Sequence, residues 1–145
     1  MEIAGLPLHP LVVHAAVVFG PLGALAALAY VVLPGRRDQL RWPMLVLAVV
    51  ATGAVVAAYV TGLSFYNSRP DLHQLPSLQT HKTRATVLFY VTLPFGVLAI
   101  VTGWLHARTG ALRLLLHGLL LVAAGTVLVL VVLTGDAGAR SVWGK

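Results

Sequence analysis

The sequence predicts an all-α fold, an integral membrane four-helix bundle. Four apolar stretches are each long enough to cross a hydrocarbon core of about 30 Å, which takes about 20 helical residues, and they contain essentially no charge. Charged residues make up only 10% of the chain, against about 25% in a typical soluble domain. The stretches also lack the two-residue alternation of a membrane β-barrel. We expect one domain over residues 1–145, because no linker or low-complexity tract divides the chain.

The first span is expected over about residues 10–33. Pro10 suits the first turn of a helix, where a missing N–H group costs little, and Pro34 with Gly35 ends the span. The residues before it include Glu2 but no Lys or Arg, so the positive region of a cleavable signal peptide is missing. We therefore expect this span to be retained.

The other three spans are expected over about residues 43–65, 85–105 and 112–134. Small residues favour close packing of helices in lipid, where the hydrophobic effect gives little incentive for association. Such residues interrupt the first span and give the second a small-residue face: Gly20, Gly23, Gly53, Ala57, Ala58 and Gly62. Close contact between helix backbones is the expected result.

Four spans place both chain ends and the middle connection on one membrane face. That connection, residues 66–84, is longer than a helix–helix turn requires, and such loops are usually functional or disordered. Lys and Arg are nearly balanced between the two faces, but they are denser in the two short loops, which favours a cytoplasmic position for those loops. We expect a multi-pass protein of the cell membrane whose termini and loop 66–84 are extracytoplasmic.

Histidines carry the site prediction, because an ionisable side chain inside a membrane is costly to bury without a partner. His9 directly precedes the first span, where its chain is free to turn inward, His14 lies near the start of that span, and His81 lies just before the third. His14 lies about 6 Å below the start of its span, at about 1.5 Å per residue. His14 and His81 are therefore expected at similar depths on neighbouring helices.

The leading interpretation is a membrane protein that binds a redox cofactor, b-type haem, near the extracytoplasmic face for electron transfer. Neutral imidazole is the commonest metal ligand, and histidine commonly holds haem iron. His14 and His81 are the expected axial pair, with His9 as a substitute or supporting donor. Arg84 and Arg140 are the expected partners of the haem propionates, through charge-assisted hydrogen bonds.

Two alternatives remain open. A copper- or zinc-binding or sensory module would use five ligands of suitable chemistry: His9, His14, His73, His81 and Asp136. A structural or interaction protein would use its histidines only to join helices, with His14 donating to a carbonyl group or to Asp136.

A second metal or haem site, near the other membrane face, is a further alternative. His106 ends the third span, and His117 lies about a turn and a half into the fourth, so the two would be neighbours across a short loop. The alternative is a pair of ordinary interfacial histidines.

Other chemistry finds little support in the sequence. The chain has no cysteine, which excludes disulfides, iron–sulfur clusters and thiol catalysis, and no nucleotide, zincin or serine hydrolase motif is found. We expect no stand-alone enzyme and no nucleic-acid partner. The expected partners are the lipid bilayer and a membrane or extracytoplasmic redox protein, and a homo-oligomer is a further alternative.

Three features together resemble a prokaryotic four-helix membrane family, domain of unknown function 2231. These are residues 5–14, read as GLPLHPLVVH, then His81, then the tail at residues 134–144, read as TGDAGARSVWG. The resemblance covers nearly the whole chain and implies that His9, His14, His81 and the tail are shared features. The family has no established activity, but its layout is similar to two-haem b-type cytochrome bundles, which implies haem.

The chain departs from the family pattern in its tail. Asp136 and the terminal Gly144 and Lys145 stand where the family pattern implies histidines. A histidine ligand from the tail is therefore excluded, while a capping or hydrogen-bonding role for the tail remains.

Overall fold

The structure, a computed structural model, describes residues 2–3 and 6–143. Four long helices account for most of these residues: α1 (Leu8–Val32), α2 (Arg37–Asn67), α3 (Pro76–Trp104) and α4 (Ala111–Trp143). Two short 3-10 helices, η1 (Pro34–Arg36) and η2 (Pro70–Leu72), lie in connections, and β1 (Glu2–Ile3) pairs antiparallel with β2 (Leu6–Pro7). Each long helix is long and apolar enough to cross a membrane. The predicted four-helix membrane bundle is confirmed.

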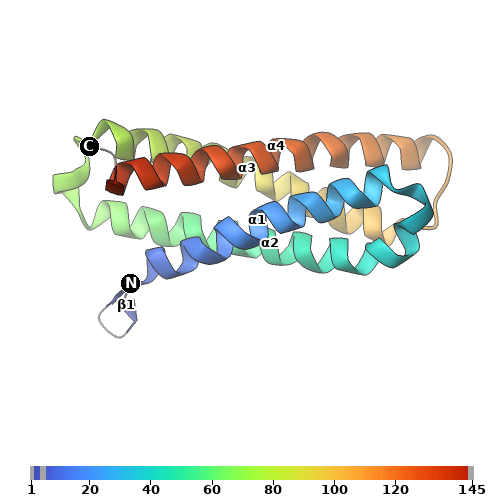
Figure 1. Cartoon of the computed structure of the whole chain (residues 1–145), viewed down its shortest axis with the longest axis horizontal. Helices are drawn as coiled ribbons and strands as arrows, with labels where there is room; N and C mark the ends of the chain where they lie inside the picture. Colours follow the sequence, from blue (N-terminus) through green and yellow to red (C-terminus); the bar gives the residue numbers. More distant parts are fainter. Residues whose placement is uncertain (1, 4–5, 144–145) are drawn as a thin grey trace.

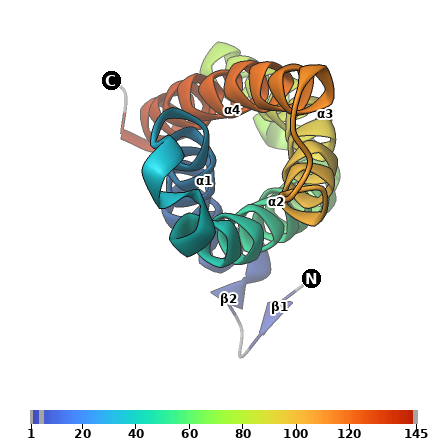
Figure 2. The same ribbon diagram turned by 90° about the vertical axis from the view of Figure 1, so that its right-hand side faces the viewer.

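The four helices form a ring in which each packs mainly against two others. Helix α1 contacts α2 and α4, and α3 contacts α4 and α2, so α1 and α3 face each other across the ring (Figure 2). Both ends of the described chain lie at one end of the bundle with the α2–α3 connection, which we call the terminal end (Figure 1). The connections at residues 33–36 and 105–110 lie at the other end, which we call the arginine end. This arrangement of ends and connections is the one predicted.

The α2–α3 connection is much shorter than predicted. Helix α2 continues to Asn67 and α3 begins at Pro76, so residues 68–75 alone join them. The prediction of a loop over residues 66–84 was wrong. A helix that continues beyond the membrane core is as polar as a loop, so hydropathy cannot distinguish the two. Pro76 starts α3 at a position that tolerates a missing N–H, and His81 therefore lies inside a helix.

The tail is also helical. Helix α4 reaches Trp143 instead of ending near residue 134, and the Asp136 carboxylate accepts a hydrogen bond of 2.9 Å from Arg140 Nε one turn later. Such a pair, four residues apart, supports helical structure. The tail thus positions side chains against the neighbouring helix α3.

Small residues set the close approach of α1 and α2. A Cβ added at Gly23 would lie 2.7 Å from Ala51 Cβ and 2.8 Å from the Leu47 carbonyl oxygen, so no side chain fits there. Gly53, by contrast, has nothing within 4 Å of an added Cβ. Its predicted place on a packing face was wrong, because Gly53 is exposed on the far side of α2.

Arginines at the arginine end cap two helices. Arg37 Nη2 donates to the Val31 carbonyl at 2.9 Å, at the end of α1. Arg41 Nε donates to the Gly103 carbonyl at 2.9 Å, at the end of α3. The last carbonyl groups of a helix lack partners within the helix and carry partial negative charge. These two arginines therefore stabilise helix ends as well as supplying charge near the headgroups.

The outer surface suits a bilayer. Large apolar side chains are exposed along all four helices, and Trp42, Trp104 and Trp143 are 63%, 81% and 83% exposed near helix ends. Tryptophan is enriched where the hydrocarbon core meets the headgroups. This surface has the pattern of a protein surrounded by lipid.

Candidate functional site

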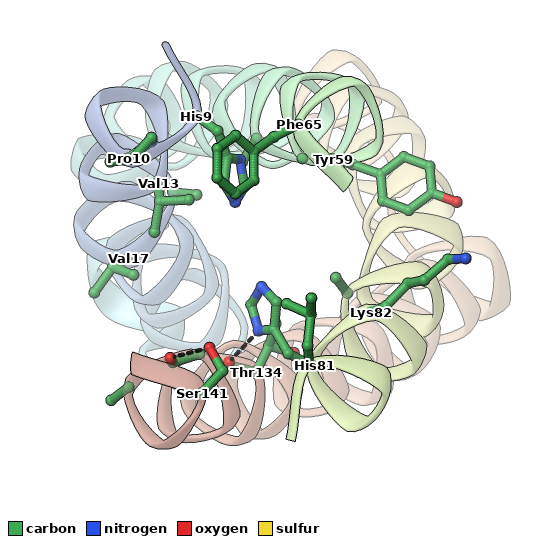
Figure 3. Close-up of a pocket in the computed structure, with 18 of the residues that line it drawn as sticks. His9, Pro10, Val13, Val17, Tyr59, Phe65, His81, Lys82, Thr134 and Ser141 are labelled. Carbon is green, nitrogen blue, oxygen red and sulfur yellow. Dashed lines mark hydrogen bonds between the residues drawn. The ribbon is translucent and has the colours of Figure 1, made fainter. Parts of the chain in front are cut away.

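A cavity of about 820 Å³ lies between the helices at the terminal end. All four helices contribute to its walls, which are largely apolar, and Leu72 and Leu75 of the α2–α3 connection also line it. Small-molecule sites are commonly apolar cavities of about 300–1,000 Å³ with a few polar groups. Here the polar groups that stand out are histidines (Figure 3).

His9 enters the cavity from the first turn of α1. Its Nδ1 lies 3.3 Å from Thr61 Oγ1 on α2, and that hydroxyl donates its own proton to the Ala57 carbonyl at 2.7 Å. Thr61 therefore accepts, and His9 Nδ1–H donates. In a neutral imidazole the other nitrogen, Nε2, then keeps its lone pair.

His81 enters the cavity from the second turn of α3. Its Nδ1 lies 3.1 Å from the Thr134 carbonyl oxygen on α4. A carbonyl oxygen only accepts, so His81 Nδ1–H is the donor and the neutral ring keeps its lone pair on Nε2. Both histidines therefore have the same protonation pattern, although different helices hold them.

Each of these two rings rests against a glycine. A Cβ added at Gly62 of α2 would lie 2.9 Å from His9 Cε1, and one added at Gly138 of α4 would lie 3.1 Å from His81 Cε1. A larger residue at either position would push the ring toward the middle of the cavity. The sequence prediction assigned Gly62 to helix packing and missed this role, because only the fold brings each glycine to its histidine.

His9 and His81 point toward each other from opposite walls of the cavity (Figure 3). They come from α1 and α3, the helices that lie across the ring from one another. Each Nδ1 is held by the protein, so each ring can present Nε2 to a molecule between them. The arrangement can hold one ligand from two sides.

His14, the predicted partner of His81, is placed differently. It belongs to the residues that line the cavity, but it is exposed and its Nδ1 lies 2.6 Å from the Pro10 carbonyl of its own helix. The predicted hydrogen bond from His14 across a helix interface was wrong, because the acceptor belongs to the same helix and Asp136 pairs with Arg140. His9 is the α1 histidine that faces His81.

The five ligands of the predicted copper or zinc site are not brought together. His73 Nε2 donates to the Tyr66 carbonyl at 2.8 Å, and its ring stacks on Tyr66 with centroids 4.0 Å apart. Asp136 bonds Arg140 instead of a histidine. Within residues 2–3 and 6–143, no three histidine or carboxylate side chains are grouped closely enough to hold a metal ion.

The predicted propionate partners lie outside the cavity. Arg84 Nη1 donates to the Leu133 carbonyl at 2.8 Å, and both Arg84 and Arg140 line a second, smaller hollow. The cation on the cavity wall is Lys82, whose Nζ lies 4.1 Å from the centroid of the Tyr66 ring. The sequence prediction used Lys82 only in the balance of Lys and Arg between the two membrane faces, although Lys82 directly follows His81 in the chain.

His106 and His117 meet at the arginine end, as predicted, around the buried Tyr30. The Tyr30 hydroxyl lies 2.7 Å from His106 Nδ1, and His106 Nε2 lies 2.7 Å from Asp38 Oδ1. The Tyr30 and His117 rings meet edge to face, with centroids 5.6 Å apart. Both ring nitrogens of His106 have hydrogen-bond partners, so this arrangement offers no free His106 nitrogen to the second metal or haem site.

Comparison with known proteins gives a family. The family model described as predicted membrane protein (DUF2231) matches residues 5–145. The chain therefore belongs to this family, and the resemblance carried by its opening motif, His81 and tail is confirmed. No curated protein and no solved structure matches the chain.

Proposed function

We propose that this family member binds a b-type haem in the cavity at the terminal end and passes single electrons. The observation that carries the proposal is the facing pair His9 and His81, in which a protein acceptor holds each Nδ1 and no described residue hydrogen-bonds either Nε2. In this proposal His9 replaces His14 as the α1 ligand, and His14 contributes to the cavity wall.

The hydrogen bonds of the pair support a ligand role. Histidines that bind metals usually donate their other N–H to a carbonyl or similar group, which fixes the ring orientation and makes the ligand nitrogen more basic. The Thr134 carbonyl does this for His81, and the Thr61 hydroxyl does it for His9. Facing helices of four-helix bundles commonly build such sites.

The walls of the cavity also support the proposal. All four helices contribute apolar side chains to the walls around the two histidines, as is usual for small-molecule sites. Haem bound here would supply a one-electron carrier. The chain itself would orient both imidazoles through the hydrogen bonds of their Nδ1–H groups.

The charge distribution favours an extracytoplasmic cavity. Five arginines lie at or near the arginine end: Arg36, Arg37, Arg41, Arg108 and Arg113. Lys and Arg in short loops favour the cytoplasmic side. The terminal end then faces outward, where a membrane or extracytoplasmic redox protein, or a second copy of the chain, would exchange electrons.

Absorption spectroscopy tests the proposal. Protein made with ample haem and purified in detergent should show a Soret band, with sharp α and β bands on reduction, as expected of two nitrogen ligands. His9→Ala and His81→Ala should each abolish the low-spin spectrum, while His73→Ala, which removes a histidine outside the cavity, should leave it unchanged. A wild-type protein without visible absorption would contradict the proposal.

A second candidate is that the two histidines only join helices. His81 joins α3 to α4 through Thr134, and His9 joins α1 to α2 through Thr61, which favours this alternative. It predicts that His9→Ala and His81→Ala lower thermal stability of a protein that never binds haem. Metal analysis of the same sample distinguishes both candidates from a copper or zinc protein.

A further inference from the structure

We infer that a polar hollow on the outer side of helices α3 and α4 binds a phosphate group, and that the headgroup of an acidic phospholipid supplies it. The hollow has a volume of about 370 Å³ and is lined by Ser77, Thr80, Arg84, Asp136, Ala137 and Arg140. It is separate from the histidine cavity, and the inference does not rest on haem binding.

Two arginines from different helices converge on the hollow. Arg84 of α3 uses Nη1 to donate to the Leu133 carbonyl, which holds the guanidinium in place and leaves its other N–H groups available. Arg140 of α4 uses Nε to donate to Asp136, which leaves its two terminal nitrogens available. Arginine presents planar donors that match the oxygens of a phosphate.

The charge balance of the hollow is positive. Its lining includes two arginines and one carboxylate, Asp136, so one positive charge remains uncompensated. Asp38 lies at the opposite end of the bundle, and Asp71 pairs with Arg69 at 3.1 Å. A monoanionic phosphodiester would neutralise the remaining charge.

The surroundings favour a lipid as the source of the phosphate. One turn deeper along α3, Val87 is 46% exposed, and on α4 Leu133 and Val129 are 41% and 58% exposed. A polar hollow at the terminal end is therefore followed by an exposed apolar strip that runs toward the bilayer centre. A headgroup in the hollow and acyl chains along the strip would match this order.

Binding measurements on the full chain in detergent test the inference. The probes are dioctanoyl phosphatidylglycerol, inorganic phosphate and dioctanoylglycerol, which has the same chains without phosphate. The test variant is Arg84→Gln with Arg140→Gln. The matched control is Arg36→Gln with Arg108→Gln, which removes the same charge at the arginine end. We expect phosphatidylglycerol to bind the wild type and the control, with affinity about tenfold or more lower in the test variant.

The other outcomes are equally informative. Binding of inorganic phosphate but not of the lipid, with the same arginine dependence, supports the phosphate site and assigns it to a free anion. Equal binding of phosphatidylglycerol and dioctanoylglycerol, or an unchanged affinity in the test variant, overturns the inference.

Asp136→Asn provides a gain-of-binding test that a misfolded protein would not pass. The substitution removes the only carboxylate of the hollow's lining and frees Arg140, so phosphatidylglycerol should bind several-fold more tightly. Unchanged or weaker binding by a folded Asp136→Asn variant would overturn the electrostatic basis of the site.

Discussion

The His81 ring lies against Gly138, where an added Cβ would be 3.1 Å from both Cε1 and Nδ1 of the imidazole. The same ring donates from Nδ1 to the Thr134 carbonyl, one turn earlier on α4. One face of α4 thus fixes both the position of the ring and the direction of its N–H group. Gly138 matters because it leaves room for the histidine, and the glycine-rich tail is therefore part of the candidate site.

Gly138→Ala should disturb the site while leaving the helix intact. The methyl group forces the His81 ring to move by a few tenths of an ångström, which weakens its bond to Thr134. Changes to groups that orient a metal ligand cost roughly tenfold or more in affinity, so haem affinity measured by titration at the Soret band should fall by that factor.

Gly125→Ala is the matched control for this variant. Gly125 lies on the same helix, outside the lining of the cavity, with nothing within 4 Å of an added Cβ, so alanine should leave haem affinity unchanged and leave the helix at least as stable. Equal affinities of the two variants would show that the contact between Gly138 and His81 does not position the ring.

Gly23→Ala should destabilise the bundle. The added Cβ would meet Ala51 Cβ at 2.7 Å and the Leu47 carbonyl at 2.8 Å, and backbone atoms cannot move aside as a flexible side chain can. Overpacking of this kind costs about 1–3 kcal/mol, which a thermal unfolding curve in detergent would detect. Gly53→Ala, on the exposed side of the next helix, should leave the unfolding temperature nearly unchanged.

Tyr30→Phe should weaken the arginine end. The carboxylate of Asp38 accepts from His106 Nε2–H, so in the neutral ring His106 Nδ1 accepts from the Tyr30 hydroxyl. Phenylalanine removes this donor from a side chain that is 1% exposed. The loss of one hydrogen bond lowers the free energy of unfolding by about 0.5–1.5 kcal/mol.

Tyr90→Phe is the control for that measurement. Tyr90 is 65% exposed, and surface changes usually stay within about 0.5 kcal/mol. A Tyr30→Phe variant as stable as Tyr90→Phe would mean that the contact with His106 contributes nothing to stability.

The α2–α3 connection should respond to acid through Asp71. The hydrogen bond from Arg69 is the main cause that holds the pKa of the Asp71 carboxyl below its usual value of 3.8. Because the folded pKa is lowered, the stabilisation is present above the usual value and is lost as the pH falls through the folded pKa. An NMR titration of Asp71 should show its pKa rising toward 3.8 in Arg69→Gln, and an unchanged pKa would contradict this.

The fold was predictable from hydropathy because four long uncharged stretches leave few other architectures. Helix ends were less predictable, since Gln79 to Arg84 are polar in sequence yet helical in the structure. The pairing of His9 with His81 was missed because the predicted direction of a helical side chain depends on the residue at which the helix begins. The sequence does not fix that residue. His9 was expected to precede the helix, whereas α1 begins at Leu8 and carries His9 in its first turn.

The orientation in the membrane can be tested with single cysteines, because the chain has no cysteine of its own. Ser68 lies in the α2–α3 connection at the terminal end, and Thr109 lies in the α3–α4 connection at the arginine end; both are exposed. If the arginine end is cytoplasmic, as the density of arginine in short loops favours, a membrane-impermeant maleimide added to whole cells should label Ser68→Cys and leave Thr109→Cys unlabelled. Opening the cells should make Thr109→Cys reactive. The reverse pattern would place the histidine cavity on the cytoplasmic side, and any electron partner of the protein would then have to be sought there.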